Sequence, residues 1–241
     1  MSALTAAGLL TVWEQAQTSH PIERALRLLH ASYPSVPVET LSTLSLGQRD
    51  ALLLALREQV FGGQISGVAT CPACGEQLEV ELQVDDLIQL PTADPSDLRL
   101  SAEGYEVWFR LLNSGDLMRL AESGQADGAR LLESSVLAAD HQGAVVDPDD
   151  LPETVRQALA DALDQADPGA LLLIDLRCPA CEHRWENLFD IVMFLWAEID
   201  TWARRLLREV HVLARAYGWR EADILNMSAL RRNSYLEMVS E

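Results

Sequence analysis

The sequence contains no lysine. It has 18 basic residues among 241, and all of them are arginine. A Walker phosphate-binding loop, a Schiff-base enzyme and a lysine general base all need lysine, so these three classes are excluded. The motifs G-x-S-x-G, G-x-G-x-x-G and H-E-x-x-H are also missing, and the five histidines are dispersed. We therefore expect a non-enzymatic protein with no small-molecule substrate.

Positive charge is scarce overall. The 18 basic residues face 37 acidic ones, which gives a net charge of −19 that repels phosphate backbones and anionic membranes. The N-terminal stretch MSALTAAGLLTVWEQ has no basic region before a long apolar run, and the longest apolar run, Ile191–Ala197, is too short to span a bilayer. We expect a cytoplasmic protein that binds neither nucleic acid nor membranes.

Cysteine is rare, and its placement is specific. The four cysteines form two C-P-A-C motifs, Cys71/Cys74 and Cys178/Cys181, separated by 103 residues. Zinc prefers four thiolates in a tetrahedron, and each C-x-x-C turn offers two of them. Strand-like sequence follows the first motif (QLEVELQV) and flanks the second (ALLLIDL and HRWENLF). The pattern predicts one structural Zn²⁺ site in a zinc ribbon that is split by a large insertion.

Other interpretations of the cysteines stay open at this point. C-P-x-C also occurs in thiol oxidoreductases, although no thioredoxin-like βαβ pattern surrounds it here. The thiols can also be metal-free or disulfide-bonded. His183 lies two residues after Cys181 and is a candidate replacement ligand, but four thiolates already complete the shell, which favours a surface histidine.

The remaining sequence is mostly helical, so the fold class is mainly α with a small β zinc-ribbon-like subdomain (α+β). Apolar spacing and caps predict helices at about 21–33, 46–61, 113–122, 126–138, 151–165 and 190–217, with a strand at 105–112. The stretch 91–97 (PTADPSD) is expected to be a linker and 141–150 an exposed loop. A short helix, a capping break at Ser228 and a final helix should end the chain.

These elements predict five segments along the chain. They are an N-terminal helical region (1–66), the first knuckle with its strands (67–110), a helical acidic insertion (111–169), the second knuckle with its strands (170–189) and the long C-terminal helix with terminal helices (190–241).

The long C-terminal helix carries an apolar stripe and several arginines. The stripe consists of Leu195, Ile199, Trp202, Leu206, Val210, Leu213 and Tyr217. Such a stripe is typical of ordinary core, but tryptophan and arginine are also favoured at interface hot spots. The candidate partner-binding residues are Trp202, Arg205, Tyr217, Trp219 and Arg231.

Several longer stretches resemble a known family. LSLGQRDALLLALREQVFG, the two C-P-A-C knuckles, YGWREADIL and RRNSYL are similar to the baseplate hub assembly chaperones of T-even-type phages, in particular to the cysteine-bearing branch associated with contractile injection systems. The resemblance implies a protein that helps to assemble, or sits within, the baseplate and hub of a phage-tail-like particle. It implies baseplate and hub proteins as partners.

We therefore expect a baseplate assembly factor or component that acts by protein contact. In this hypothesis zinc at the four cysteines fixes the N-terminal helices against the long C-terminal helix. Two alternatives are a zinc-ribbon nucleic-acid adaptor, for which the knuckles supply only Arg177 and Arg184, and a thiol oxidoreductase, which needs an accessible thiolate of low pKa.

Overall fold

The computed structural model describes residues 4–88, 98–124 and 128–240, and the chain divides into two compact units. Unit 1 consists of Met1–Val36 and Val192–Glu241, and unit 2 is Pro37–Ile191. Helices and antiparallel sheets occur together, which confirms the α+β class. The linker expected at 91–97 lies outside the described residues, and the five-segment division stays a prediction.

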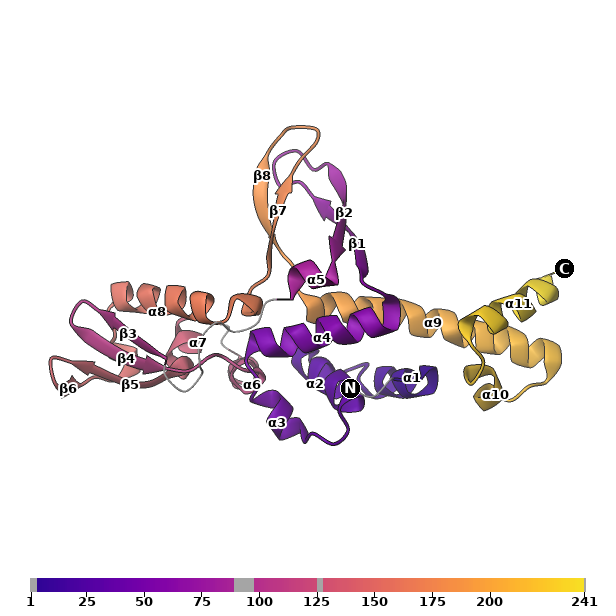
Figure 1. The fold of residues 1–241 in the computed structure, drawn as a ribbon, viewed down its shortest axis with the longest axis horizontal. Helices are drawn as coiled ribbons and strands as arrows, with labels where there is room; N and C mark the ends of the chain where they lie inside the picture. Colours follow the sequence, from indigo (N-terminus) through magenta and orange to yellow (C-terminus); the bar gives the residue numbers. More distant parts are fainter. Residues whose placement is uncertain (1–3, 89–97, 125–127, 241) are drawn as a thin grey trace. The chain divides into compact units, whose positions relative to one another are not determined.

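Unit 1 is made of helices (Figure 1). They are α1 (Ala6–Gln15), α2 (Pro21–Ser32), α9 (Ile191–Tyr217, which begins at the boundary with unit 2), α10 (Glu221–Leu225) and α11 (Ala229–Ser240). Pro21 occupies the first turn of α2, where its missing N–H costs no hydrogen bond. Helix α9 follows its predicted range closely, whereas the sequence interpretation had not assigned α1. No helix in the described part of the chain is both long and apolar enough to cross a membrane.

The buried face of α9 holds unit 1 together. Five of its seven predicted stripe residues are buried, namely Leu195, Ile199, Leu206, Val210 and Leu213. Trp13 of α1 donates its indole N–H to Asp200 at 2.9 Å, and the guanidinium of Arg24 in α2 lies 4.5 Å from the ring centre of Trp196. A hydrogen bond and a cation–π contact therefore link α9 to the two N-terminal helices.

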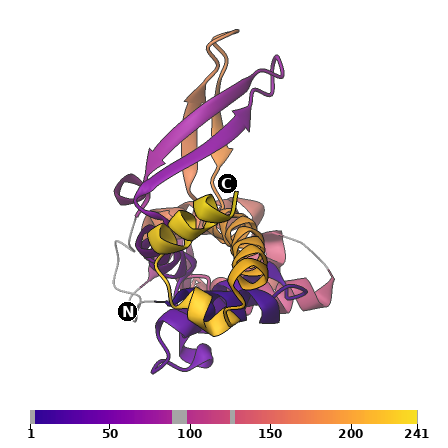
Figure 2. The ribbon, with the colours of Figure 1, turned by 90° about the vertical axis from the view of Figure 1, so that its right-hand side faces the viewer.

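The C-terminal helices pack on the end of α9. Val210 and Leu213 form a small core with Ile224 of α10, and the side chains of α11 pack against it. Figure 2 shows α10 and α11 beside the end of α9. The break predicted at Ser228 is confirmed, because its hydroxyl accepts a hydrogen bond from the N–H of Arg231 at 3.3 Å and α11 begins at the next residue.

Unit 2 contains most of the strands. Its helices are α3 (Val38–Ser42), α4 (Leu46–Phe61), α5 (Val84–Leu87), α6 (Ser114–Ser123), α7 (Gly128–Ser135) and α8 (Glu153–Ala166), with 3₁₀ turns η1 (Pro148–Asp150) and η2 (Pro168–Ala170). Its strands are β1 (Gln64–Thr70), β2 (Gln77–Gln83), β3 (Arg99–Ala102), β4 (Tyr105–Phe109), β5 (Val136–His141), β6 (Ala144–Val145), β7 (Leu173–Arg177) and β8 (Arg184–Leu188).

Strands β3 to β6 form one antiparallel sheet, in that order, with α8 packed on one face. The sheet corrects two expectations. The helix predicted through residue 138 ends at Ser135, and the loop predicted at 141–150 contains β6 and η1. Residues Val136–His141 become β5 because they pair with β4 and place Ala139, which is 3% exposed, in the core under α8. Tertiary pairing here overrides local helix propensity.

The N-terminus of α4 is fixed by residues distant in sequence. Ser45 and Gln48 form a capping box, and the N–H of Gly47 donates to the carboxylate of Asp167 at 3.0 Å. A Cβ on Gly47 would lie 2.1 Å from an oxygen of Asp167, so only glycine allows this approach. The stretch LGQRD at the start of α4 is therefore hydrogen-bonded to Asp167, which lies 120 residues later, just before the turn η2.

Candidate functional site

Each pair of cysteines lies at the tip of a β-hairpin, one formed by β1 and β2 and the other by β7 and β8. The two tips have the same backbone hydrogen bonds. The N–H of Cys71 donates to the carbonyl of Glu76 at 2.8 Å, and the N–H of Cys178 donates to that of His183 at 2.9 Å. Both turns therefore close between the first cysteine and the fifth residue after it.

The fourth residue after each first cysteine donates its N–H back to that cysteine's carbonyl. These residues are Gly75, at 2.9 Å from Cys71, and Glu182, at 3.0 Å from Cys178. Both have left-handed backbones, with φ of 77° and 59°. Glycine adopts this conformation without penalty, whereas a glutamate is strained there. The second knuckle keeps the geometry of the first despite a less suitable residue.

The two hairpins lie side by side in both views (Figures 1 and 2). The sulfur of Cys71 lies 3.7 Å from that of Cys181, and the sulfur of Cys74 lies 3.6 Å from that of Cys178. All four sulfurs lie within 4.8 Å of one another. A tetrahedral Zn²⁺ with Zn–S bonds of about 2.3 Å has sulfurs about 3.8 Å apart, so the thiols fit such an ion.

The four clustered thiols shift one another's pKa values. Burial raises the pKa of Cys178, but hydrogen bonds from the backbone N–H groups of Cys181 and Ala180 outweigh it and lower this pKa to about 7. The N–H of Glu76 lowers the pKa of Cys74, yet contact with the neighbouring sulfurs, Cys181 first, raises it to about 12. Thiols this close cannot all ionise alone, because like charges repel. A bound divalent cation would offset part of that repulsion.

Burial divides the cluster into two inner and two outer sulfurs. Cys71 and Cys178 are 1% and 0% exposed, while Cys74 and Cys181 are exposed. His183 is not in the cluster, since its ring stacks on Trp185 with ring centres 6.0 Å apart. Among the described residues, the four cysteines are the one group of three or more metal-ligating side chains close enough to share an ion.

The expected partner-binding residues fall into two places on unit 1. Tyr217 and Trp219 stack with ring centres 4.5 Å apart, and Arg231 lies over Tyr235, whose ring packs edge-on against Trp219. Trp202 and Arg205 lie about 18–22 Å further back along α9, at 1.5 Å per residue. The structure therefore brings three of the five residues together. Tyr235, which joins them, is not among the predicted partner-binding residues.

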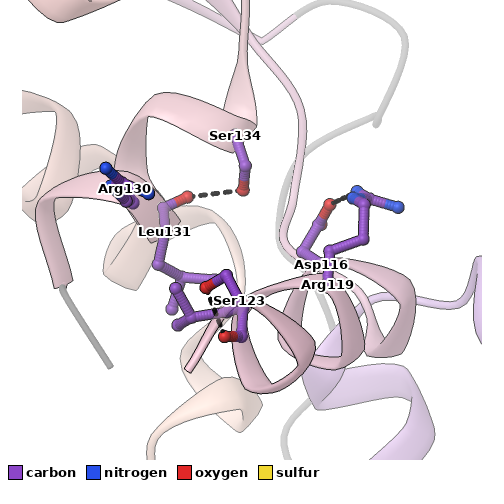
Figure 3. Close-up of a pocket in the computed structure, with 7 residues that line it drawn as sticks. Asp116, Arg119, Ser123, Arg130, Leu131 and Ser134 are labelled. Atoms are coloured by element: carbon purple, nitrogen blue, oxygen red, sulfur yellow. Dashed lines mark hydrogen bonds and ion pairs between the residues drawn. The ribbon is translucent and has the colours of Figure 1, made fainter. Parts of the chain in front are cut away.

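A surface pocket of about 190 Å³ lies between α6 and α7 (Figure 3). The hydroxyls of Ser123 and Ser134 donate to the carbonyls of Leu120 and Leu131, each at 2.7 Å. At one side of the pocket, the carboxylate of Asp116 forms ion pairs with Arg119 and Arg110. Ser123, Ser134 and Asp116 are therefore already engaged by other groups of unit 2.

Comparison with protein families decides which family the chain represents. The sequence model described as T4 bacteriophage base plate protein matches residues 7–196, which is more than half of the chain. The chain belongs to the T4 baseplate protein family. Searches of curated proteins and of solved structures each found no match.

The match to the T4 baseplate family includes the whole candidate metal centre. Both knuckles and the LGQRD stretch lie within residues 7–196, whereas YGWREADIL and RRNSYL lie beyond them. For this baseplate protein, the sequence predictions of a baseplate family and of four clustered cysteines are confirmed.

Proposed function

We propose that this baseplate protein is a non-enzymatic assembly factor or component of a phage-tail-like contractile injection system, acting in the cytoplasm or within the particle. It works by contact with baseplate and hub proteins. The observation that carries the proposal is the family match over residues 7–196 together with a four-cysteine cluster built from both hairpins. The four cysteines have the geometry of a metal-binding site, and the rings around Trp219 are packed against one another. Both features suit a protein that holds other proteins.

The metal we propose is structural Zn²⁺, held by the four cysteines of a split zinc ribbon. When bound, zinc would offset part of the negative charge of the four thiolates and join the two hairpins at their tips. The chain's own contribution is to orient the thiols, since the paired backbone bonds at Glu76 and His183 fix both turns. Four thiolates complete a tetrahedral shell, which is typical of structural rather than catalytic sites.

The clamp has a mechanical consequence within unit 2. A two-stranded hairpin alone is marginally stable in water. Strands β1 and β2 follow α4, and strands β7 and β8 follow α8 and η2. Zinc bound at the tips would therefore link two ribbons that follow separate helices in the chain. We propose that this stiffened pair of ribbons and the cluster around Trp219 present surfaces to baseplate and hub proteins.

The role is tested by quantitative mass spectrometry on purified particles and on the soluble lysate of the same native cells. A fixed ratio to sheath and baseplate proteins in the particles identifies a permanent component. Presence in the lysate alone, with loss of particles when the gene is deleted, identifies an assembly factor. Absence from particles combined with normal assembly after deletion refutes both.

The clamp is tested separately on the purified protein. Cys178→Ser should lower the zinc content measured by elemental mass spectrometry and lower the melting temperature, because a buried ligand is lost. His183→Ala is the matched control and should leave both values unchanged. Unchanged zinc and melting in the Cys178 variant contradicts the clamp.

The two alternative functions make different predictions. A nucleic-acid adaptor needs a basic surface, yet the tip arginines Arg177 and Arg184 lie next to the exposed acids Asp175 and Glu186. Fluorescence anisotropy with single- and double-stranded oligonucleotides at low salt tests it. A thiol oxidoreductase should reduce insulin, and stoichiometric zinc without insulin reduction refutes that function.

A further inference from the structure

The ribbon formed by β7 and β8 has one covered face and one open face. Ile174, Leu176 and Trp185 on one face are partly buried, while the alternate residues are exposed. The exposed face consists of three rows of directly opposed residues, in the order Leu173/Leu188, Asp175/Glu186 and Arg177/Arg184 from the base to the tip. We call these the leucine, acidic and arginine rows.

Each row pairs residues of the same kind across the two strands. Like charges placed opposite each other destabilise an antiparallel pair. Asp175, Glu186 and Arg184 form no ion pair with any residue that the structure describes, and Arg177 pairs only with the tip residue Glu182, at 2.8 Å. Exchanging one acid with one arginine would have given opposite charges across the strands.

The leucine row is also unexplained by packing within the chain. Leu173 is 47% exposed and Leu188 is 56% exposed. Both lie on the same face as the charged rows, at the base of the ribbon. The face therefore combines an apolar end, a negative band and a positive band, and each is accessible to another molecule.

The order of the rows is complementary to itself. Residues on one face of a strand repeat about every 6.8 Å, so the acidic and arginine rows are one such step apart. If a second identical face is turned end for end about an axis between these two rows, each acidic row faces an arginine row. One step further, each leucine row faces the other copy's tip, where Pro179, Ala180 and Glu182 are exposed.

We propose that the open face of the β7–β8 ribbon binds the same face of a second copy of this chain, antiparallel, in a two-fold dimer. The charge pattern supplies the match, since two acidic rows and two arginine rows become four opposed pairs of unlike sign. Such two-fold contacts use one patch on both copies. This inference does not depend on the baseplate role or on zinc as the particular metal.

The contact should be weak and sensitive to salt. Strands of five residues make a face smaller than the roughly 800 Å² per partner of a standard stable interface. The net charge of −19 on each copy opposes approach. At 0.15 M salt the Debye length is about 8 Å, which screens distant repulsion more than contacting pairs, whereas about 1 M salt weakens both. Association should therefore be seen at high protein concentration near 0.15 M salt and be lost near 1 M.

Reciprocal charge reversal tests the pairing by sedimentation velocity. One variant carries Asp175→Arg and Glu186→Arg, which makes both charged rows positive. The other carries Arg177→Glu and Arg184→Glu, which makes both negative. Each variant alone should stay monomeric, and an equimolar mixture should recover a concentration-dependent rise in sedimentation coefficient equal to or greater than that of the wild type.

A matched control separates the face from the net charge. Glu79→Arg with Glu81→Arg changes the charge by the same amount as the first variant but on the exposed residues of β2. This control should associate at least as well as the wild type. Circular dichroism and zinc content verify that each variant is folded.

Several results overturn the proposal. These are a wild-type protein that remains monomeric up to about 1 mM, a mixture that associates no better than its components, or a control that also loses association. The wild-type measurement needs no variant, so a variant that fails to fold does not rescue the idea. If the wild type is monomeric and the charge-reversed variants are lost from particles, the face binds another baseplate protein. That result refutes the proposed dimer.

Discussion

Replacing Gly47 by alanine tests the junction between α4 and η2. The new Cβ would lie 2.1 Å from Oδ1 and 2.9 Å from Cγ of Asp167, and 3.0 Å from the backbone carbon of Gly169. Real Cβ atoms do not come this close, so the Asp167 side chain must move. That movement removes its hydrogen bond from the N–H of Gly47, now 3.0 Å long.

The magnitude follows from three contributions. A hydrogen bond to a charged group contributes about 1.5–3 kcal/mol, and overpacking a filled site costs a further ~1–3 kcal/mol. The higher helix propensity of alanine offsets up to about 1 kcal/mol. We expect a net loss of roughly 1.5–6 kcal/mol, which is about 3–24 °C in the melting temperature of a unit this size.

Urea denaturation and thermal melting followed by circular dichroism measure the change. Gly128→Ala at the start of α7 is the matched control, because its Cβ meets no atom within 4 Å, and it should be neutral or stabilising by up to about 1 kcal/mol. Asp167→Ala, alone and combined with Gly47→Ala, completes a double-mutant cycle. The clash predicts that Gly47→Ala costs little once the carboxylate is gone. Additive losses, or a Gly47 variant within about 0.5 kcal/mol of wild type, refute the reasoning.

Three further perturbations have defined outcomes. Asp116→Asn should lower the free energy of unfolding by about 2–3 kcal/mol at neutral pH, because the neutral amide loses the charge attraction to Arg110 and can accept only one of its two 2.7 Å bonds. Burial raises the pKa of Asp116, but the hydrogen bonds of Arg110 and the backbone lower it below its ordinary 3.8, so its contribution is full above that pH and is lost as the pH falls below it. Urea titrations at pH 6 and pH 3 should therefore differ more for wild type than for the Asn variant, and equal differences contradict this. Glu182→Gly should raise the melting temperature of the zinc-loaded protein, since a non-glycine residue with a left-handed backbone costs about 1–2 kcal/mol. Gly75→Glu should lower the melting temperature for the same reason. A lower melting temperature for Glu182→Gly and a higher one for Gly75→Glu would disprove the shared geometry. Trp219→Ala removes the ring contacts of Trp219 with Tyr217 and Tyr235, whose ring centres lie 4.5 and 4.8 Å away. A loss of about 1.4 kcal/mol should speed amide hydrogen exchange in α11 at least tenfold relative to α2, the internal reference. Unchanged exchange in α11 would show that these rings do not stabilise the helix.

Local signals allowed much of the helical structure to be predicted. Helix α4 runs from Leu46 to Phe61 as expected, because Ser45 caps its start and Gly62 follows its end with a φ of 93°. The helix expected from about residue 113 begins with Asn113 as its cap, since the Asn113 side chain accepts from the N–H of Asp116. These features depend on residues within a few positions of each other, which is the range that a sequence pattern encodes directly.

Long-range pairing accounts for the elements that the sequence did not reveal. Strand β5 follows α7 without a break signal, and its register with β4 is set by contacts about 30 residues away. The role of Gly47 depends on Asp167, and nothing in the local sequence marks that approach. The four cysteines were predictable despite their separation because the same C-P-A-C motif occurs twice and thiolate chemistry requires four ligands.

The separation of the two knuckles in the sequence also determines the delay between their synthesis on the ribosome. Cys74 and Cys178 are separated by 103 residues. At about 5–20 residues per second, the first pair leaves the ribosome roughly 5–20 s before the second. Through that interval a metal taken up by Cys71 and Cys74 has only two of its four protein ligands. The nascent chain must therefore carry an open half-site while the sheet and α8 are still being made, and ribbon closure is among the last folding events of unit 2.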